Sequence, residues 1–445
     1  MDTITVWIKE GRALAPEKSA GMDYALGIDP IDKVDGLQNF GLMLPDYDNS
    51  KELRSRGGIP NVLHKLAFGQ RVTVGYIGGS ITFQEGWRPR TTSWLKSRFP
   101  KAAIAEVNAA ISGTGADLGA ARIEGDLLIH EPDLVFVEFV VNGAGLRDVE
   151  GLVRKVWRKN PNTDICFVYT LRSDQVESYK PGSDPSFPSS LTAFESIAEY
   201  YGIPGLFFGY VLGELYALDK LVPKGEDLID PEGRVAFTKD GIHPVATGDQ
   251  LYAGTAARSI LKMQREGIQP AAHVLKAPMD PYNWEDATMR DAADFTSTLD
   301  IVDTATADYD TTFPYSGLHA TIKKMYPRIV KMTTPGDHIT VTFRGTSLGL
   351  ADVGGPFSGQ LSVRVDDREP IRVDRFMVYN SYLRYQYFFL PEMEDAEHTV
   401  TFTLTSEISD KRTLVLNKAD FDRNPDAYKG NEVYVGKIIA VGRFV

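Results

Sequence analysis

The hydrophobic positions of this chain follow two different periods, one after the other. From residue 70 to about 265, short apolar runs alternate with longer segments of helical period. Strands that alternate with helices of this length predict βαβ crossovers and a parallel sheet covered on both faces. The expected strands are 72–77, 103–108, 134–139, 165–169 and 205–208, and the expected helices are 91–98, 117–129, 149–159, 189–201 and 247–266.

Runs with a period of two replace the helical period after about residue 270. Several short strands separated by turn signals are typical of an all-β sandwich. The boundary falls in the proline-containing stretch Ala271–Pro281, so we expect an α/β domain over 58–270 and a β-sandwich accessory domain over 282–445. The expected sandwich strands are 339–343, 360–365, 385–390, 398–404 and 433–441.

Residues 1–57 have no sustained period. Ile4–Ile8 alternates like one strand, after which Gly, Pro and Asp recur without a pattern. Because this strand has no obvious place in a parallel sheet, we expect an N-terminal arm over 1–57 that packs on the sandwich.

The charge balance narrows the choice of partners. The chain has 445 residues and a net charge of −12, with 60 acidic and 48 basic side chains. Without a basic run, nucleic acid and anionic membrane are poor partners, and a neutral substrate is favoured. No stretch approaches the roughly 20 apolar residues of a membrane span. No signal peptide is visible, which fits a cytoplasmic protein or an exported one whose signal was removed. The oligomeric state stays open.

The single cysteine, Cys166, excludes an internal disulfide and a cysteine-rich metal site. It lies in a strand-like apolar run, where a buried and unreactive thiol is expected. The histidines are scattered and lack the spacing of a zinc site. We therefore expect neither a metal nor a cofactor.

The first candidate for chemistry is Ser80. The apolar run Val72–Ile77 ends in Gly78-Gly79-Ser80, which predicts a buried strand that closes in a tight turn. Open α/β sheets bind ligands at the carboxyl ends of their strands, so Ser80 is a candidate nucleophile. Alone, the stretch also fits a glycine turn followed by a helix-capping serine.

The second candidate is the stretch Asp240-Gly241-Ile242-His243, near the end of the α/β region. A hydroxyl nucleophile needs an imidazole to take its proton and a carboxylate to orient that imidazole. The spacing lets both side chains converge within a single loop. An Asp-Gly turn followed by a helix-capping residue explains the same residues without catalysis.

Two further loops follow the second and third strands, at Asn108–Gly115 and Glu138–Gly145. Neighbouring parallel strands bring such loops side by side, so the Gly113 N–H and the Asn142 amide are candidate oxyanion donors near Ser80. The stretch Gly113–Gly119, with Glu138 further on, also resembles a dinucleotide fingerprint. Its third glycine is misplaced by one position, and it opens the second βα unit instead of the first.

Taken together, these blocks occur in the order and on the elements of the SGNH (GDSL-type) hydrolases, and the chain resembles that superfamily from about residue 70 to 260. The resemblance implies a flavodoxin-like three-layer α/β/α domain and ester hydrolysis without a metal. It assigns Ser80 as the nucleophile, His243 as the base and Asp240 as its orienting acid. It also implies an oxyanion hole formed by the N–H groups of Ser80 and Gly113 and the side chain of Asn142.

Two positions depart from the family's pattern. Gly79 stands where Asp is usual, a variant that belongs with a subgroup carrying Gly-Gly-Ser-Ile-Thr, and Gly143 follows Asn142 where Asp is usual. These departures keep open a carbohydrate-binding protein with a decayed hydrolase site. A lipase or thioesterase of the same superfamily is the other alternative.

The C-terminal part carries a second resemblance. Phe343–Leu350, Gly354-Gly355-Pro356 and Val363–Asp366 are similar to the jelly-roll sandwich attached to some carbohydrate acetylesterases of this superfamily. This resemblance implies an acylated carbohydrate as the substrate. We therefore expect a serine esterase that removes small acyl groups, above all acetyl, from a carbohydrate or polysaccharide.

Overall fold

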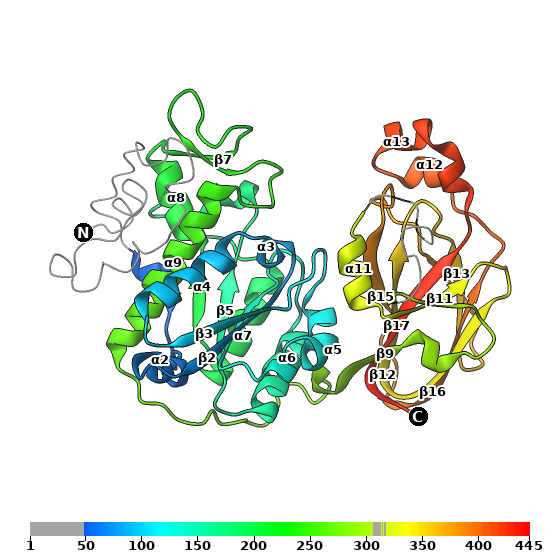
Figure 1. Cartoon of the computed structure of the whole chain (residues 1–445), viewed down its shortest axis with the longest axis horizontal. Helices are drawn as coiled ribbons and strands as arrows, with labels where there is room; N and C mark the ends of the chain where they lie inside the picture. Colours follow the sequence, from blue (N-terminus) through cyan, green and yellow to red (C-terminus); the bar gives the residue numbers. More distant parts are fainter. Residues whose placement is uncertain (1–48, 306–312, 314, 316) are drawn as a thin grey trace. The chain divides into compact units, whose positions relative to one another are not determined.

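The computed structural model describes residues 49–305, 313, 315 and 317–445 (Figure 1). Its internal contacts divide the chain into two compact units, Met1–Glu285 and Asp286–Val445. We call them the α/β unit and the all-β unit. None of the described helices is long and apolar enough to cross a membrane.

The α/β unit is built on a six-stranded sheet with the order β1-β6-β5-β4-β2-β3. All neighbouring strands are parallel except β1, which pairs antiparallel with β6 at the edge. The order of its parallel strands is that of the flavodoxin-like doubly wound fold, as the resemblance implies. The strands are β1 (Leu53–Arg54), β2 (Arg71–Gly78), β3 (Ala103–Asn108), β4 (Leu134–Glu138), β5 (Asp164–Tyr169) and β6 (Gly205–Phe207).

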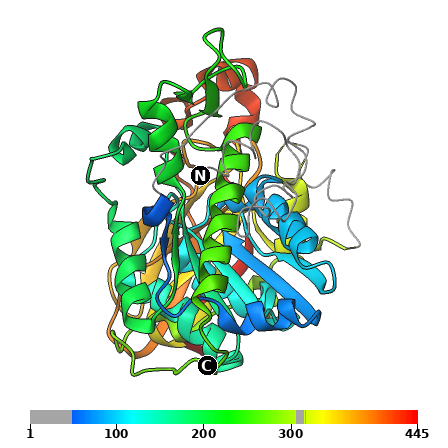
Figure 2. The same ribbon diagram turned by 90° about the vertical axis from the view of Figure 1, so that its left-hand side faces the viewer.

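Helices cover both faces of this sheet, with α2, α4 and α9 on one side and α5, α6 and α7 on the other (Figures 1 and 2). The two central strands β4 and β5 are buried throughout, because both of their faces pack on helices. The helices are α2 (Pro60–Ala67), α3 (Ser80–Phe83), α4 (Trp87–Arg98), α5 (Ala116–Asp126), α6 (Leu146–Lys159), α7 (Ser189–Tyr201), α8 (Gly209–Ala217) and α9 (Ala246–Glu266). A small parallel sheet, β7 (Leu221–Lys224) and β8 (Val235–Thr238), precedes α9.

The described end of the N-terminal arm belongs to the α/β unit. Strand β1 pairs with β6, and the fully buried Glu52 accepts hydrogen bonds from Arg258 at 2.6 and 2.9 Å and from Thr255 at 3.0 Å. The prediction that the arm packs on the sandwich is therefore wrong for residues 49–57. The arm packs here because Glu52 forms an ion pair with Arg258, 206 positions further along the chain. Local periodicity does not reveal a contact between such distant residues. The strand predicted at Ile4–Ile8 lies outside the described residues.

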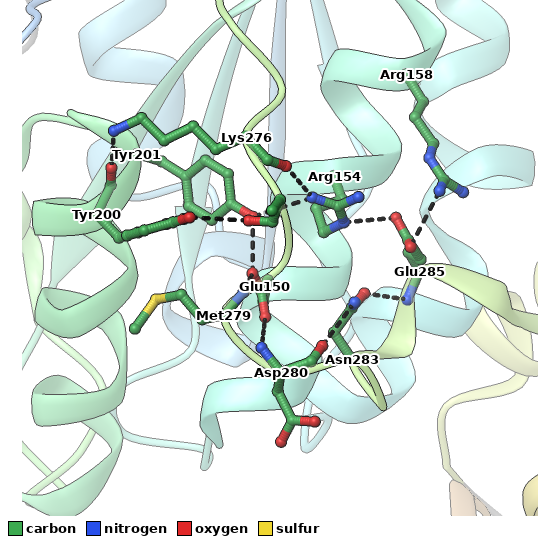
Figure 3. Close-up of polar contacts among 11 residues, drawn as sticks. Glu150, Arg154, Arg158, Tyr200, Tyr201, Lys276, Met279, Asp280, Asn283 and Glu285 are labelled. Carbon is green, nitrogen blue, oxygen red and sulfur yellow. Dashed lines mark hydrogen bonds and ion pairs between the residues drawn. The ribbon is translucent and has the colours of Figure 1, made fainter.

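The segment that leaves the α/β unit, residues 271–285, is bound closely to helix α6 (Figure 3). The buried Glu150 of α6 accepts hydrogen bonds from the backbone N–H groups of Met279 at 2.6 Å and Asp280 at 2.9 Å. Arg154, one turn further along α6, donates to the carbonyl oxygen of Lys276 at 2.7 Å and to Glu285 at 2.6 Å. We call residues 271–285 the connecting segment.

This attachment moves the boundary along the chain. The α/β unit extends to Glu285, whereas the sequence places the start of the sandwich at residue 282. At Gly151 the connecting segment comes so close that a β-carbon would lie 2.5 Å from the carbonyl carbon of Trp284. The proline-containing stretch is thus a packed part of the first unit, although its composition resembles that of a linker.

The all-β unit consists mainly of antiparallel strands around the 17-residue strand β12. One edge of β12 pairs with β16 over its first half and with β15 over its second, while β17 runs along the other edge. Its second half is buried throughout, as expected of the centre of a sandwich. The strands are β9 (Ala287–Asp291), β10 (Ile301–Asp303), β11 (Arg328–Met332), β12 (His338–Gly354), β13 (Gln360–Val365), β14 (Ile371–Asp374), β15 (Arg384–Phe389), β16 (Ala396–Leu404) and β17 (Val433–Phe444). Three short helices, α11 (His319–Met325), α12 (Lys411–Leu414) and α13 (Lys418–Arg423), complete the unit.

Cys166 lies in the middle of β5 and is fully buried. Burial raises the pKa of its thiol well above the usual range, because the thiolate would lose its hydration. The thiol therefore packs as a small apolar side chain, as its sequence context predicts.

Candidate active site

The predicted site residues belong to loops at the carboxyl edge of the parallel sheet. Strand β2 lies between β3 and β4, which is where the strand order reverses direction. Ligands of doubly wound folds bind outside the strand ends at such a switch point. Ser80 follows β2, Gly113 follows β3 and Asn142 follows β4, so all three come from loops around the switch point.

Ser80, His243 and Asp240 form one hydrogen-bonded chain. Ser80 Oγ lies 2.7 Å from His243 Nε2, and His243 Nδ1 lies 2.6 Å from Asp240 Oδ2. Ser80 is the first residue of α3, whereas the other two belong to the loop between β8 and α9, and His243 lies 163 residues after Ser80. The structure thus brings together the three side chains that the sequence selects, in the geometry of a nucleophile, a base and an orienting acid.

The second carboxylate oxygen of Asp240 fixes the direction of that side chain. Oδ1 accepts hydrogen bonds from the backbone N–H groups of Ile242 and His243, both at 2.8 Å. Partial burial raises the pKa of Asp240, but the hydrogen bonds from the His243 side chain and from these two N–H groups outweigh it. They lower the pKa to about 2. Asp240 therefore stays ionised and leaves only Oδ2 to face the imidazole.

The loop that carries Asp240 and His243 is bound to the segment that follows β5. The N–H of Ser173 donates to the carbonyl oxygen of Gly241 at 3.0 Å. Gly241 has a φ of +93°, which a residue with a β-carbon rarely adopts. We call residues 240–243 the acid–base loop.

The amide of Asn142 packs directly against Gly79. A β-carbon on Gly79 would lie 1.9 Å from Asn142 Oδ1 and 2.9 Å from Nδ2, so any larger residue here would displace the amide. This explains the first departure from the family's pattern, because an aspartate at position 79 would occupy the space of Asn142. The amide lies beside the turn that carries Ser80, and its buried Oδ1 has no hydrogen-bond partner among the described residues.

Gly143, the second departure, also has a structural reason. Its φ is +117°, in the region that glycine adopts readily and an aspartate does not. The N–H groups of Asn142 and Gly143 both donate to the carbonyl oxygen of Phe139, at 3.0 and 2.9 Å, and thereby close the turn. In this chain the backbone turn at Phe139–Gly143 holds Asn142 in position. Gly79 leaves room for its amide, and Gly143 allows the positive φ that the turn requires.

The loop of Gly113 is anchored to the two neighbouring loops. The N–H of Ile111 donates to the carbonyl oxygen of Gly78 at 3.0 Å, and the N–H of Ala116 donates to that of Gly143 at 3.0 Å. Gly113 is exposed, with a φ of +74°. The second contact uses an N–H at the start of α5, which a dinucleotide phosphate would need. The loop geometry therefore does not favour the nucleotide interpretation.

A fully buried carboxyl lies at the end of β4, and sequence reasoning did not assign it a role in the site. Glu138 accepts hydrogen bonds from the hydroxyls of Thr82 at 2.8 Å and Thr170 at 2.7 Å. Burial raises its pKa to about 7, although these hydroxyls and the backbone N–H groups of Gly79 and Thr82 oppose that rise. In the sequence, Glu138 fits only the acid of a dinucleotide fingerprint, and the threonine of Gly-Gly-Ser-Ile-Thr is the one available signal of its role.

Within the described ranges, no group of three or more His, Cys, Asp and Glu side chains is arranged to hold a metal ion.

No known family model matches the chain. A 124-residue stretch of this chain is 32% identical to a 3-dehydroquinate synthase of Corynebacterium glutamicum (strain R). The match covers 26% of this chain. The chain spans about a third (33%) of the length of that curated relative, so the match is a local one.

Solved structures match over far more of the chain. A two-domain esterase active on acetylated mannans superposes with a TM-score of 0.67 and 21% sequence identity, over 88% of this chain and 98% of its own. The same kind of esterase crystallised with mannopentaose gives a TM-score of 0.65, with equal identity and coverage. At this identity the likeness concerns the fold. This chain therefore has the two-domain fold of those structures, with a flavodoxin-like α/β domain followed by an all-β sandwich domain.

Proposed function

We propose that this protein is a serine esterase that removes acetyl groups from a carbohydrate. The observation that carries the proposal is the continuous hydrogen-bonded chain from Ser80 through His243 to Asp240, at 2.7 and 2.6 Å. Such a chain activates a hydroxyl that is otherwise a weak nucleophile. An intact chain also argues against a decayed site.

In the first half of the reaction, Ser80 Oγ attacks the carbonyl carbon of the acetyl ester, and His243 Nε2 takes the hydroxyl proton. Asp240 stabilises the imidazolium that forms and holds its Nδ1–H. The tetrahedral intermediate collapses, the sugar oxygen leaves with the proton from His243, and the acetyl group remains on Ser80. In the second half, a water molecule attacks this acyl-enzyme by the same route and releases acetate.

Three donors are proposed for the oxyanion of the tetrahedral intermediate: the N–H groups of Ser80 and Gly113 and the side-chain amide of Asn142. The contact between Asn142 and the Gly79-Ser80 turn supports a role for the amide. The hydrogen bond from Ile111 to Gly78 supports a role for the Gly113 loop, because it ties that loop to the same turn. Donors held in this way need no rearrangement as charge develops.

The choice of a carbohydrate rests on the whole chain. The esterase active on acetylated mannans matches both units of this chain, not the α/β unit alone. A net charge of −12 also disfavours polyanionic substrates and suits a neutral glycan. We propose that the all-β unit serves as an accessory domain without chemistry of its own.

The direct test is a screen of acetylated glycans for acetate release, with Ser80→Ala as the control. We expect release from at least one acetylated polysaccharide and none above background with Ser80→Ala. A fluorophosphonate should label Ser80 in the wild-type protein. Glycan binding without acetate release, and no labelling, would favour the carbohydrate-binding alternative.

A further inference from the structure

Glu138 stands between the two halves of the proposed site. It is the last residue of β4, which lies between β2 and β5 in the sheet. The turn Gly78–Ser80, which we call the nucleophile turn, follows β2, and the segment that anchors the acid–base loop follows β5. The two carboxylate oxygens of Glu138 are directed to these two segments separately: Oε2 to Thr82 and Oε1 to Thr170.

The first oxygen holds the short helix that begins with Ser80. Thr82 lies two residues after Ser80, its hydroxyl donates to Glu138, and its carbonyl oxygen accepts a hydrogen bond from the buried Arg88 at 3.1 Å. The packing here is tight, because a β-carbon on Gly78 would lie 2.9 Å from the Thr82 hydroxyl. A four-residue helix has almost no stability of its own, so these external contacts determine where Ser80 points.

The second oxygen holds the segment after β5. Thr170 lies three residues before Ser173, whose N–H donates to Gly241 in the acid–base loop. One hydrogen bond therefore links Glu138 to the helix of Ser80, and two successive hydrogen bonds link it to the loop of His243.

We propose that Glu138 is a positioning residue, which sets the distance between Ser80 and His243 by holding both segments at once. The proposal rests on the proposed function in so far as Ser80 is the nucleophile. The chemistry explains the residue type, since one carboxylate offers two acceptor oxygens on a single rigid plane. An apolar side chain of the same shape would leave two buried hydroxyls unpaired.

The alternative is that Glu138 only satisfies two buried threonines. The chain contains a matched pair that separates these roles, because the buried Thr255 donates to the buried Glu52 at 3.0 Å in the same unit. This pair joins helix α9 to the short helix Asn49–Glu52, and both elements are separate from the nucleophile turn and the acid–base loop. Thr255→Val thus removes the same kind of hydrogen bond without reaching the site.

The experiment compares Thr82→Val, Thr170→Val and Thr255→Val in the full-length protein. The readouts are the rate of Ser80 labelling by a fluorophosphonate, kcat and KM for nitrophenyl acetate, and the melting temperature. We expect all three variants to melt lower, because each leaves a buried carboxyl short of a donor. Only the first two should slow labelling and lower kcat, by about 10- to 100-fold, because a small misplacement of the nucleophile costs that much. KM should change little.

Glu138 itself is tested by Glu138→Gln against Glu138→Leu. Glutamine keeps the shape and one acceptor oxygen, so it should retain a larger share of the labelling rate than leucine. Equal labelling rates in the three threonine variants, or equal rates in the two Glu138 variants, would overturn the positioning role. If the wild-type protein is labelled at Ser80 but releases no acetate from any glycan, the substrate assignment fails and the labelling rates still decide the role of Glu138. A wild-type protein that is not labelled overturns both proposals.

Discussion

A single carboxylate, that of Asp240, determines which nitrogen of His243 carries the proton. Two backbone N–H groups donate to Oδ1, so only an acceptor oxygen can occupy that position. In Asp240→Asn the amide oxygen must take the place of Oδ1, and its NH₂ group then faces His243 Nδ1. The imidazole would carry its proton on Nε2 and could not accept the proton of Ser80.

We therefore expect Asp240→Asn to fold and to lose about 10³- to 10⁴-fold in kcat on a small acetyl ester. The measurement is steady-state kinetics together with a melting curve. A loss below tenfold would contradict the assignment of Asp240 as the orienting acid.

Gly79 and Asn142 are expected to act as one unit. Gly79→Ala puts a methyl group where the Asn142 amide lies, at an ordinary negative φ of −89°, so its effect should come through that amide. Asn142→Ala should lower kcat by about 100- to 1,000-fold, the usual contribution of one oxyanion donor. Gly79→Ala alone should cost a comparable factor, and the double variant should be no slower than Asn142→Ala.

The check is a double-mutant cycle on kcat for nitrophenyl acetate. If Gly79→Ala costs the same factor with and without Asn142, the methyl group acts on the Ser80 turn and not on the amide. A change below about threefold for Asn142→Ala would remove this residue from the proposed site.

At the scale of residues, the sequence was sufficient to select the candidate site residues that lie in short sequence motifs. Ser80, Asp240 and His243 are recognisable because each stands in a short block with its own glycines and spacing. Glu138 was not recognised as part of the site, because its partners Thr82 and Thr170 are 56 and 32 positions away and belong to different strand ends. Hydrogen bonds between the ends of different strands can be predicted only once the order of the strands in the sheet is known.

At the scale of elements, helix α6 packs tightly against the connecting segment at Gly151. Alanine is a better helix former than glycine by about 1 kcal/mol. At Gly151 this gain should be outweighed, because the added methyl group meets the backbone of Trp284 at 2.5 Å, and backbone cannot rotate away. We expect Gly151→Ala to lower the free energy of unfolding by about 1–3 kcal/mol.

Gly125→Ala is the control for this variant, since an added β-carbon in α5 meets nothing within 4 Å. It should be neutral or slightly stabilising. Limited proteolysis should also reveal new cleavage within residues 271–285 of Gly151→Ala. Equal proteolysis and equal melting in the two variants would mean that the connecting segment adjusts without cost.

The elements themselves were predictable where burial is two-sided. The five parallel strands and their five main helices lie within a few residues of the predicted ranges, because buried strands form continuous apolar runs between amphipathic helices. Seven short strands of the described residues were not predicted: β1, β7, β8, β9, β10, β11 and β14. Their backbone pairing depends on long-range partners, and segments of two to five residues carry almost no periodicity.

At the scale of the whole molecule, two buried carboxyls should make stability depend on pH. Burial raises the pKa of Glu138 from 4.5 to about 7 and that of Asp249 from 3.8 to about 7. An acid whose pKa is higher in the folded state stabilises the fold fully below its ordinary pKa. That contribution is lost as the pH rises through about 7. Asp240, with its pKa lowered to about 2, has the opposite effect and only below its ordinary value of 3.8.

The melting temperature should therefore fall between pH 5 and pH 8. In Asp249→Asn the fall should be smaller, because the amide does not titrate. The measurement is a series of melting curves of both proteins in buffers of equal ionic strength. An identical pH dependence in the two proteins would contradict the assignment of Asp249.

The two-unit organisation was predictable from the change of period near residue 270, whereas the exact junction was not. Residues 271–285 have the prolines and polar residues of a linker, yet they are fixed by the buried Glu150 and Arg154. The position of residues 49–57 could not be predicted from local sequence either, because it depends on an ion pair with the buried Arg258.

The isolation of Cys166 has a practical consequence for experiments on the whole molecule. A sole thiol that is fully buried, with a raised pKa, should not react with maleimides or spin labels in the folded protein. The wild-type chain therefore already serves as the unreactive background that other proteins acquire only after their cysteines are replaced. One cysteine introduced on the surface of each unit would accept a pair of probes, and the distance between them would report directly on the arrangement of the two units with and without a glycan.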